Sequence, residues 1–272
     1  MKKSRISPEL TTLNAGNAYW MAKLSKAVYL SNENNSPDEK KILHTLQQED
    51  EGFLSVTGAD QNSAQAALVE HKEYLCMVFR GTDEMADWLD NINLLSTEQV
   101  SGEFHQGFWE SVEDVWQIIF SQYQELMALS ADRPLFITGH SLGGAMATVV
   151  AARLTHDKIP FTSLYTFGQP RALTRKTAKA FNASCKCKFF RFQNNNDIVT
   201  RLPAVLGGYR HAGTHLYISR KRIIYKKISF WLNIFDHLYG TIDHLIRFGQ
   251  IDMVKDHDMD EYLQSIREWN LK

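Results

Sequence analysis

Residues 134–145 place an apolar strand, a tight turn and a small-residue helix in direct succession. The turn reads Gly139-His140-Ser141-Leu142-Gly143. A serine on so tight a strand-to-helix turn needs glycine two places to either side, because larger side chains would strike the strand and the helix. The pattern predicts that Ser141 is a nucleophile at a helix N-terminus, where backbone dipoles favour negative charge. A glycine-rich turn without chemistry is the alternative interpretation.

The rest of the chain alternates short β-rich runs with helical patterns, which is typical of an α/β fold with a mostly parallel sheet covered on both faces. At 272 residues, 44% of them hydrophobic, one core is sufficient, and residues 1–272 are expected to form a single domain. The predicted strands are Phe53–Thr57, Ala66–Glu70, Tyr74–Phe79, Leu135–Thr138, Phe161–Phe167, Lys188–Gln193 and His215–Ser219, and the predicted helices are Ala15–Leu30, Phe108–Leu129, Leu142–His156 and Lys176–Asn182.

Charge and cysteine content narrow the class of protein further. The formal net charge of -1 argues against a nucleic-acid-binding protein. Cys76, Cys185 and Cys187 cannot form a closed disulfide framework, and neither a signal peptide nor a spanning segment is evident. We therefore expect a cytoplasmic protein without a metal or cofactor. Peripheral membrane contact and export by a route that needs no signal peptide are the alternatives.

Five motifs follow one another between about residue 74 and residue 262. They are Phe79-Arg80-Gly81-Thr82-Asp83, Gly139-His140-Ser141-Leu142-Gly143-Gly144-Ala145, Thr166-Phe167-Gly168-Gln169-Pro170-Arg171, the run 196–203 (NDIVTRLP), and Asp256-His257-x-Met259-x-x-Tyr262. In sequence and order they resemble the class 3 lipases, an α/β-hydrolase family. The resemblance implies an α/β-hydrolase fold and a serine ester hydrolase with a Ser–Asp–His triad, which acts on acylglycerols or related lipids.

A serine nucleophile needs a general base within hydrogen-bond reach, and an acid to orient the base. In α/β-hydrolases the chain order is Ser, Asp, His, and Asp197 follows a predicted strand in a polar loop. The base is one of ten histidines. His257 precedes a predicted closing helix at the family's position, and His244 is the alternative. The other candidates after Asp197 are His211, His215 and His237, whereas His105 is expected to be structural. Without the other motifs, Asp197 would be interpreted as the aspartate of an ordinary turn.

Two backbone N–H groups must hold the negatively charged oxygen of the reaction intermediate. In this fold they come from the residue after the nucleophile and from a loop after an earlier strand, which here are Leu142 and Thr82. The family often has an aspartate nine residues after Thr82 that braces the hydroxyl of this residue. This chain has Asn91 there.

Two further segments carry apolar stripes at helical spacing. Met85, Trp88, Leu89, Ile92 and Leu95 follow the oxyanion residue directly, where the family has a lid. Ordinary core packing is the alternative. The second segment is 220–247, with basic residues at its start and an apolar face from Ile228 to Leu245. It either covers the sheet or anchors the protein to a lipid surface.

The sequence as a whole predicts a lipase that cleaves carboxylic esters of acylglycerols through an acyl-enzyme. Phospholipase A1 and short-chain carboxylesterase are the alternatives among enzymes, because the triad acts on the ester carbonyl and does not distinguish between leaving groups. A non-catalytic lipid-binding protein on the same scaffold is the alternative from a different class. The expected partner is a lipid or ester substrate.

Overall fold

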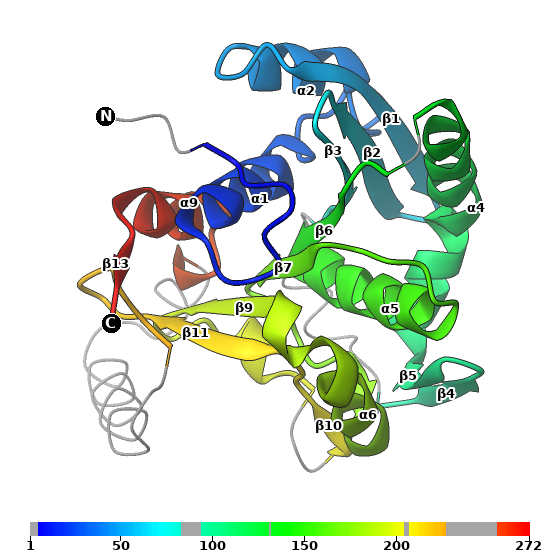
Figure 1. Cartoon of the computed structure of the whole chain (residues 1–272). Helices are drawn as coiled ribbons and strands as arrows, with labels where there is room; N and C mark the ends of the chain where they lie inside the picture. The colour runs from blue at the N-terminus through cyan, green and yellow to red at the C-terminus, as the bar shows by residue number, and fades with distance from the viewer. Residues whose placement is uncertain (1–4, 83–93, 131, 204–206, 227–254) are drawn as a thin grey trace.

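A nine-stranded mixed sheet forms the centre of the computed structural model, which describes residues 5–82, 94–130, 132–203, 207–226 and 255–272 (Figure 1). Strand pairs β3–β6, β6–β7, β7–β9, β9–β11 and β12–β13 are parallel. Pairs β1–β2, β2–β3 and β11–β12 are antiparallel. In sheet order the strands are β1 (Phe53–Gln61), β2 (Ala64–His71), β3 (Tyr74–Phe79), β6 (Leu135–His140), β7 (Ser163–Phe167), β9 (Phe189–Asn194), β11 (Thr214–Ile218), β12 (Ile223–Tyr225) and β13 (Asn270–Leu271).

The middle strands of this sheet are buried along their whole length. Every residue of β3, β6 and β7 is buried, as expected for parallel strands that carry helices on both faces. In register, Val78 pairs with Thr138, and Thr138 pairs with Tyr165. The carboxyl ends of β6, β7 and β9 therefore lie at one edge of the sheet, where ligand sites of open α/β sheets are found.

Helices cover the two faces of the sheet and give the molecule two apolar cores (Figure 1). One face carries α4 (Gln106–Leu129), α5 (Leu142–His156) and α6 (Arg175–Cys185), whose buried side chains pack with Leu164 and Phe189. The opposite face carries α1 (Ala15–Ala27), α2 (Glu39–Gln47) and α9 (Met259–Glu268), which pack with Phe190 and Phe192.

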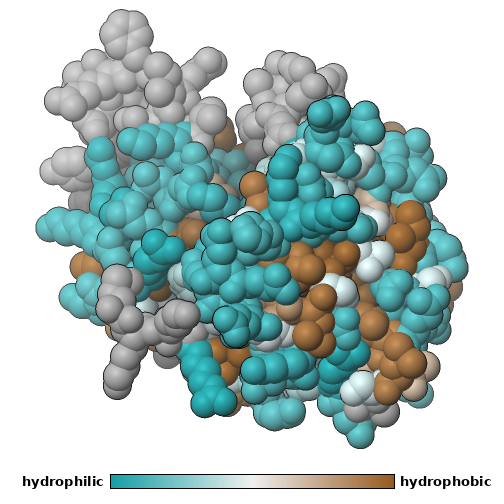
Figure 2. All heavy atoms as spheres, turned by 90° about the horizontal axis from the view of Figure 1, so that it is seen from above, coloured by the Kyte–Doolittle hydropathy of each residue, from teal (hydrophilic) through white to brown (hydrophobic). Residues whose placement is uncertain are grey.

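A second, four-stranded antiparallel sheet lies beside α6. Its strands are, in order, β10 (Tyr209–Arg210), β8 (Leu173–Thr174), β5 (Gly102–His105) and β4 (Ser96–Gln99). Short 3-10 turns occupy Lys186–Lys188 and Val199–Arg201. Figure 2 shows a mainly hydrophilic surface on which hydrophobic residues are exposed in several patches. Of the helices that the structure describes, none is long and apolar enough to cross a bilayer.

The predicted elements agree closely with this architecture. Strand β3 and helix α5 have the predicted bounds, and all the other predicted strands and helices are present with ends shifted by a few residues. The second sheet and α2 were not predicted. The proposed lid residues Met85, Trp88, Leu89 and Ile92, the residue Asn91, and Ile228 to Leu245 of the segment 220–247 lie outside the described residues.

Candidate active site

The turn that carries Ser141 has the backbone conformation expected of a nucleophile elbow. Ser141 joins β6 to α5 with φ 58° and ψ −130°, a region that residues with a side chain rarely occupy. Its amide N–H donates to the carbonyl oxygen of Phe167 on β7, at 2.9 Å. This strained conformation is held by the strand before it and the helix after it.

The flanking glycines are required by close packing within this turn. A Cβ atom on Gly139 would lie 2.3 Å from the carbonyl oxygen of Gly143. A Cβ atom on Gly143 would lie 2.1 Å from the carbonyl oxygen of Phe79, at the end of β3. The steric argument made from the sequence is therefore confirmed, and Ser141 sits where β3, β6 and α5 meet.

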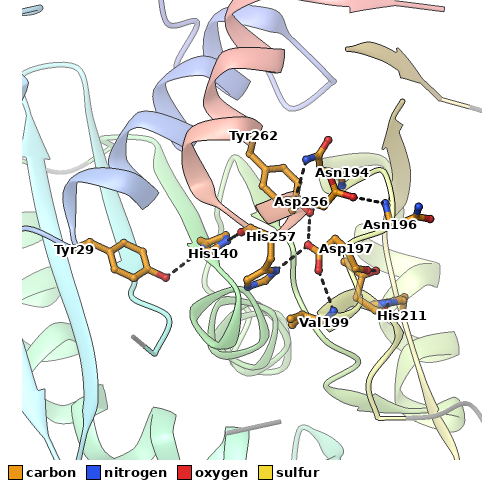
Figure 3. A network of polar contacts seen from close by, with 11 residues as sticks. Tyr29, His140, Asn194, Asn196, Asp197, Val199, His211, Asp256, His257 and Tyr262 are labelled. Carbon is orange, nitrogen blue, oxygen red and sulfur yellow. Dashed lines mark hydrogen bonds and ion pairs between the residues drawn. The ribbon is translucent and has the colours of Figure 1, made fainter. Parts of the chain in front are cut away.

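Asp197 is completely buried in the turn that follows β9. Its Oδ1 atom accepts a hydrogen bond from the N–H of Val199 at 2.9 Å. Its Oδ2 atom accepts hydrogen bonds from His257 Nδ1 at 2.8 Å and from the Tyr262 hydroxyl at 2.6 Å (Figure 3). A buried carboxylate with three donors is well stabilised, and it fixes the orientation of the imidazole ring.

His257 immediately precedes α9 and is 5% exposed. Because Nδ1 donates to Asp197, the neutral ring carries its lone pair on Nε2. Nε2 is buried, and no described residue is its hydrogen-bond partner. The ring therefore has the orientation and the free acceptor that a general base requires.

Gly168 explains how these groups approach so closely. It has φ +61°, and a Cβ atom there would lie 2.8 Å from Asp197 Oδ2 and 2.8 Å from His257 Cε1. Its neighbour Phe167 accepts the hydrogen bond from the Ser141 N–H. The end of β7 therefore lies between the turn of Ser141 and the Asp197–His257 pair.

The loops that carry Asp197 and His257 are joined by Asp256. The carboxylate of Asp256 accepts hydrogen bonds from Asn195 Nδ2 at 2.9 Å and from the N–H of Asn196 at 3.2 Å, the second of which is drawn in Figure 3. Asn194 Nδ2 donates to the carbonyl oxygen of Asp256 at 2.9 Å. These bonds fix the two loops relative to each other.

His140 links the His257 loop to the end of β3. Its Nε2 atom donates to the carbonyl oxygen of His257 at 2.7 Å, and its Nδ1 atom accepts from the Tyr29 hydroxyl at 2.8 Å (Figure 3). Tyr29 in turn accepts from the N–H of Gly81 at 3.1 Å. Burial, with the adjacent His257, lowers the pKa of His140 well below its usual range, so His140 is neutral.

The predicted oxyanion residues lie on the two sides of the serine turn. Leu142 is the first residue of α5, so its N–H has no acceptor four residues earlier in the helix. Thr82 follows Gly81, and a Cβ atom on Gly81 would lie 2.8 Å from the Cβ of Ser141. The end of β3 is thus in contact with the turn that carries the serine.

The other candidate histidines that the structure describes have different partners. His211 Nε2 donates to the carbonyl oxygen of Thr200 at 2.7 Å, and His215 Nε2 lies 3.0 Å from Gln193 Oε1. His105 stacks on Phe108 at the start of α4, as expected for a structural residue. His244 and His237 lie outside the described residues.

Sequence reasoning missed three residues that support the site: Tyr262, Asp256 and Gly168. The Tyr262 hydroxyl donates to Asp197 and accepts from the N–H of Asn194 at 2.9 Å. Burial, with the Asp197 charge, raises the pKa of Tyr262 well above its usual range, so the hydroxyl stays protonated. All three lie within the recognised motifs, but only the folded structure shows what they contact.

The chain therefore has the α/β-hydrolase fold, with a serine elbow beside a buried aspartate–histidine pair. The model of the family Lipase (class 3) matches residues 76–207, which confirms the resemblance. The secreted mono- and diacylglycerol lipase 1 of Fusarium solani is 32% identical over 57% of this chain and 47% of its own length. The lipase of Rhizomucor miehei is 29% identical over 77% of this chain and 56% of its own length.

The fold also matches solved structures. That of Rhizomucor miehei triacylglyceride lipase superposes with a TM-score of 0.64 at 22% identity, over 74% of this chain and 79% of that one. The chain spans about half the length of the curated relatives it matches. Their names correct one prediction: a cytoplasmic location is contradicted, because relatives such as that of Fusarium solani are secreted.

Proposed function

We propose that the protein is a serine ester hydrolase of the lipase type, with Ser141 as nucleophile, His257 as base and Asp197 as the acid that orients it. The observation that carries this proposal is the buried His257–Asp197 hydrogen bond of 2.8 Å, which leaves Nε2 of His257 without a partner among the described residues. The central sheet runs from β1 to β13, and helices from α1 to α9 cover it, so described residues from both ends of the chain share one architecture, which supports a single catalytic domain.

In this mechanism Ser141 Oγ attacks the ester carbonyl carbon while its proton passes to His257 Nε2. The carbonyl oxygen becomes negatively charged, and the N–H groups of Thr82 and Leu142 stabilise it. As the intermediate collapses, His257 returns the proton to the departing alcohol and the acyl group stays on Ser141. Water then attacks the acyl carbon while its proton passes to His257 Nε2, and the same N–H groups stabilise the oxyanion. As the bond between the acyl carbon and Ser141 Oγ breaks, His257 returns the proton to Oγ, which releases the carboxylic acid and free Ser141.

The proposed substrate class is acylglycerols, which the names of the mono- and diacylglycerol lipases among the relatives support. The same relatives are secreted, which supports action outside the cell. Ser141 is itself 0% exposed, so a substrate can reach it only after the surface over it opens. We propose that the segment of Met85, Trp88, Leu89 and Ile92 forms a lid, because its apolar stripe directly follows the oxyanion residue Thr82 in the sequence. Leu95, the last residue of the same stripe, is 60% exposed, which supports contact with a lipid interface.

The test combines active-site labelling with a panel of substrates. We expect a fluorophosphonate probe to label the wild type and not Ser141→Ala, and the purified protein to hydrolyse acylglycerols. The control Ser25→Ala removes a buried hydroxyl that contacts Thr138 rather than the site, so its labelling should persist. Absence of labelling in the folded wild type would instead favour a lipid-binding protein. Preference for phospholipids or short p-nitrophenyl esters would favour the two other hydrolases.

A further inference from the structure

Three polar residues form a row across adjacent parallel strands of the central sheet. Thr166 on β7 is in register with Arg191 on β9, which is in register with His215 on β11. Register neighbours in a sheet point their side chains to the same face and lie about 5 Å apart. Thr166 faces α5, because a Cβ atom on Gly144 would lie 3.4 Å from the Thr166 Cβ.

Arg191 is a buried cation in the middle of this row. The residue is 6% exposed, and its Nε and Nη1 atoms are buried with no hydrogen-bond partner in the described part of the chain. Burial, with the nearby Arg171, lowers its pKa to about 9, so the guanidinium remains charged at pH 7. Burying an unpaired charge is costly, which makes this arrangement unusual for an arginine.

Among the described residues, the titratable groups that act on Arg191 are Arg171 and Tyr262, and Tyr262 stays protonated. Within the described part of the chain, Arg171 donates to backbone carbonyl oxygens, those of Arg201 and Pro203. Burial, with the Arg191 charge, lowers the pKa values of His211 and His215 well below their usual range, so both rings are neutral. The hydroxyl of Thr166, next to Arg191 in the row, is also buried without a partner among the residues described.

We propose that Arg191 and Thr166 form a buried binding site for a small inorganic anion, which supplies the missing counter-charge. The guanidinium Nε and Nη1 groups and the Thr166 hydroxyl are donors without acceptors, which is the chemistry that an anion satisfies. The neutral His211 ring borders the site, with Nε2 as its N–H and a lone pair on Nδ1. The site is distinct from the Asp197–His257 pair and takes no part in the chemistry.

The proposed site connects to the active site through one short path. His211 donates to the carbonyl oxygen of Thr200, and the Thr200 hydroxyl donates to the carbonyl oxygen of Asp197 at 2.8 Å. A bound anion would therefore stabilise the position of the Asp197 loop through the hydrogen bonds of His211 and Thr200. Its loss should lower the stability of the fold before it changes the chemistry.

Thermal unfolding in different anions tests the proposal. At matched ionic strength, chloride, bromide or phosphate should raise the Tm of the wild type relative to gluconate, which is too bulky for a buried site. Above the Kd, each tenfold increase in the binding anion should add about 2–5 °C. A response to phosphate but not to halides would identify an oxyanion, and the reverse a halide. A Tm that is identical in all four salts would overturn the proposal.

Variants test whether Arg191 is responsible for the rise of Tm with the anion. Arg191→Met should lose it, whereas Arg133→Met should keep it, because Arg133 is paired with Glu70 at 2.8 Å. His215→Glu places a carboxylate beside Arg191 and should raise the Tm in gluconate while removing the response. An Arg191→Met protein more stable than the wild type in every salt would mean that the site is empty.

A crystal soaked in bromide gives a direct readout that needs no variant. An anomalous peak within hydrogen-bond distance of Arg191 Nε is expected if the site takes halides, and phosphate density if it takes oxyanions. Water alone at this position, in crystals grown with either anion, would contradict the proposal.

Discussion

At the residue scale, the Tyr262 hydroxyl is a side-chain donor to Asp197 that lies outside the proposed triad. Tyr262→Phe should lower kcat about tenfold with little change in KM, because one charge-assisted hydrogen bond that orients the carboxylate is lost. Tyr19→Phe is the matched control, since the Tyr19 hydroxyl also donates to a carboxylate, that of Glu49, at 2.6 Å. Equal kcat values for the two variants would reduce Tyr262 to a structural role.

The crowding at Gly168 leads to a second prediction. Gly168→Ala should reduce kcat at least about a hundredfold, because the new Cβ would push Asp197 and His257 apart. Gly208→Ala separates this effect from backbone strain: Gly208 also has a positive φ, of +87°, but nothing lies within 4 Å of its Cβ position. Steady-state kinetics and Tm of both variants check this. Loss of activity in both would attribute the effect to backbone strain alone.

The identity of the base is tested by combining variants. His257→Ala should lose several orders of magnitude in kcat, as Ser141→Ala does, and the double variant should lose no more, because the two residues act as a unit. His244→Ala and His237→Ala should retain activity. An active His257→Ala beside an inactive His244→Ala would transfer the role of base to His244.

At the scale of elements, the proposed lid leads to a prediction about substrate form. Trp88→Ser should reduce activity on aggregated lipid much more than on a soluble short-chain ester, because an open lid gains free energy by burying its apolar stripe in the interface. The hydrolysis rates of the wild type and Trp88→Ser are compared on a lipid emulsion and on a dispersed short-chain ester. Equal losses on the two substrates would favour core packing.

The elements also show how far the sequence could predict the structure. Strands β3, β6 and β7 and helix α5 were predictable because their apolar runs and glycines are strong local signals. Strands β8, β10 and β13 have two residues each, and they exist only through pairing with distant segments. Likewise, the residues of the proposed triad could be selected from motifs, whereas the contact of Tyr262 with Asp197 joins residues 65 positions apart and depends on packing.

At the scale of the whole molecule, buried histidines determine how stability depends on pH. Burial lowers the pKa values of His140, His211 and His215 well below the ~6.5 of free imidazole. Below about pH 6.5 the unfolded chain therefore binds protons that the folded protein does not, so the free energy of unfolding falls as pH falls. The expected loss is up to about 1.4 kcal/mol per pH unit for each histidine.

Urea unfolding at pH 7.5, 6.0 and 5.0 measures this dependence. His215→Gln removes one of the three groups and should make the slope shallower by about 1 kcal/mol per pH unit. Comparison with the wild type cancels the contribution of carboxylates, which both proteins share. Parallel curves for the two proteins would show that His215 takes up its proton equally in the folded and unfolded states.

The bonds between Asp256 and the run Asn194–Asn196 have a consequence for chain connectivity. They attach residues 255–272 to the rest of the protein independently of the peptide chain from Lys226 to Lys255, as do the Lys26–Asp260 ion pair and the pairing of β13 with β12. The segment 255–272 should therefore bind to the rest of the protein even without the connecting peptide chain. A C-terminal fragment that carries His257 should reassociate with the remaining chain and restore activity, as the small half of a split enzyme does.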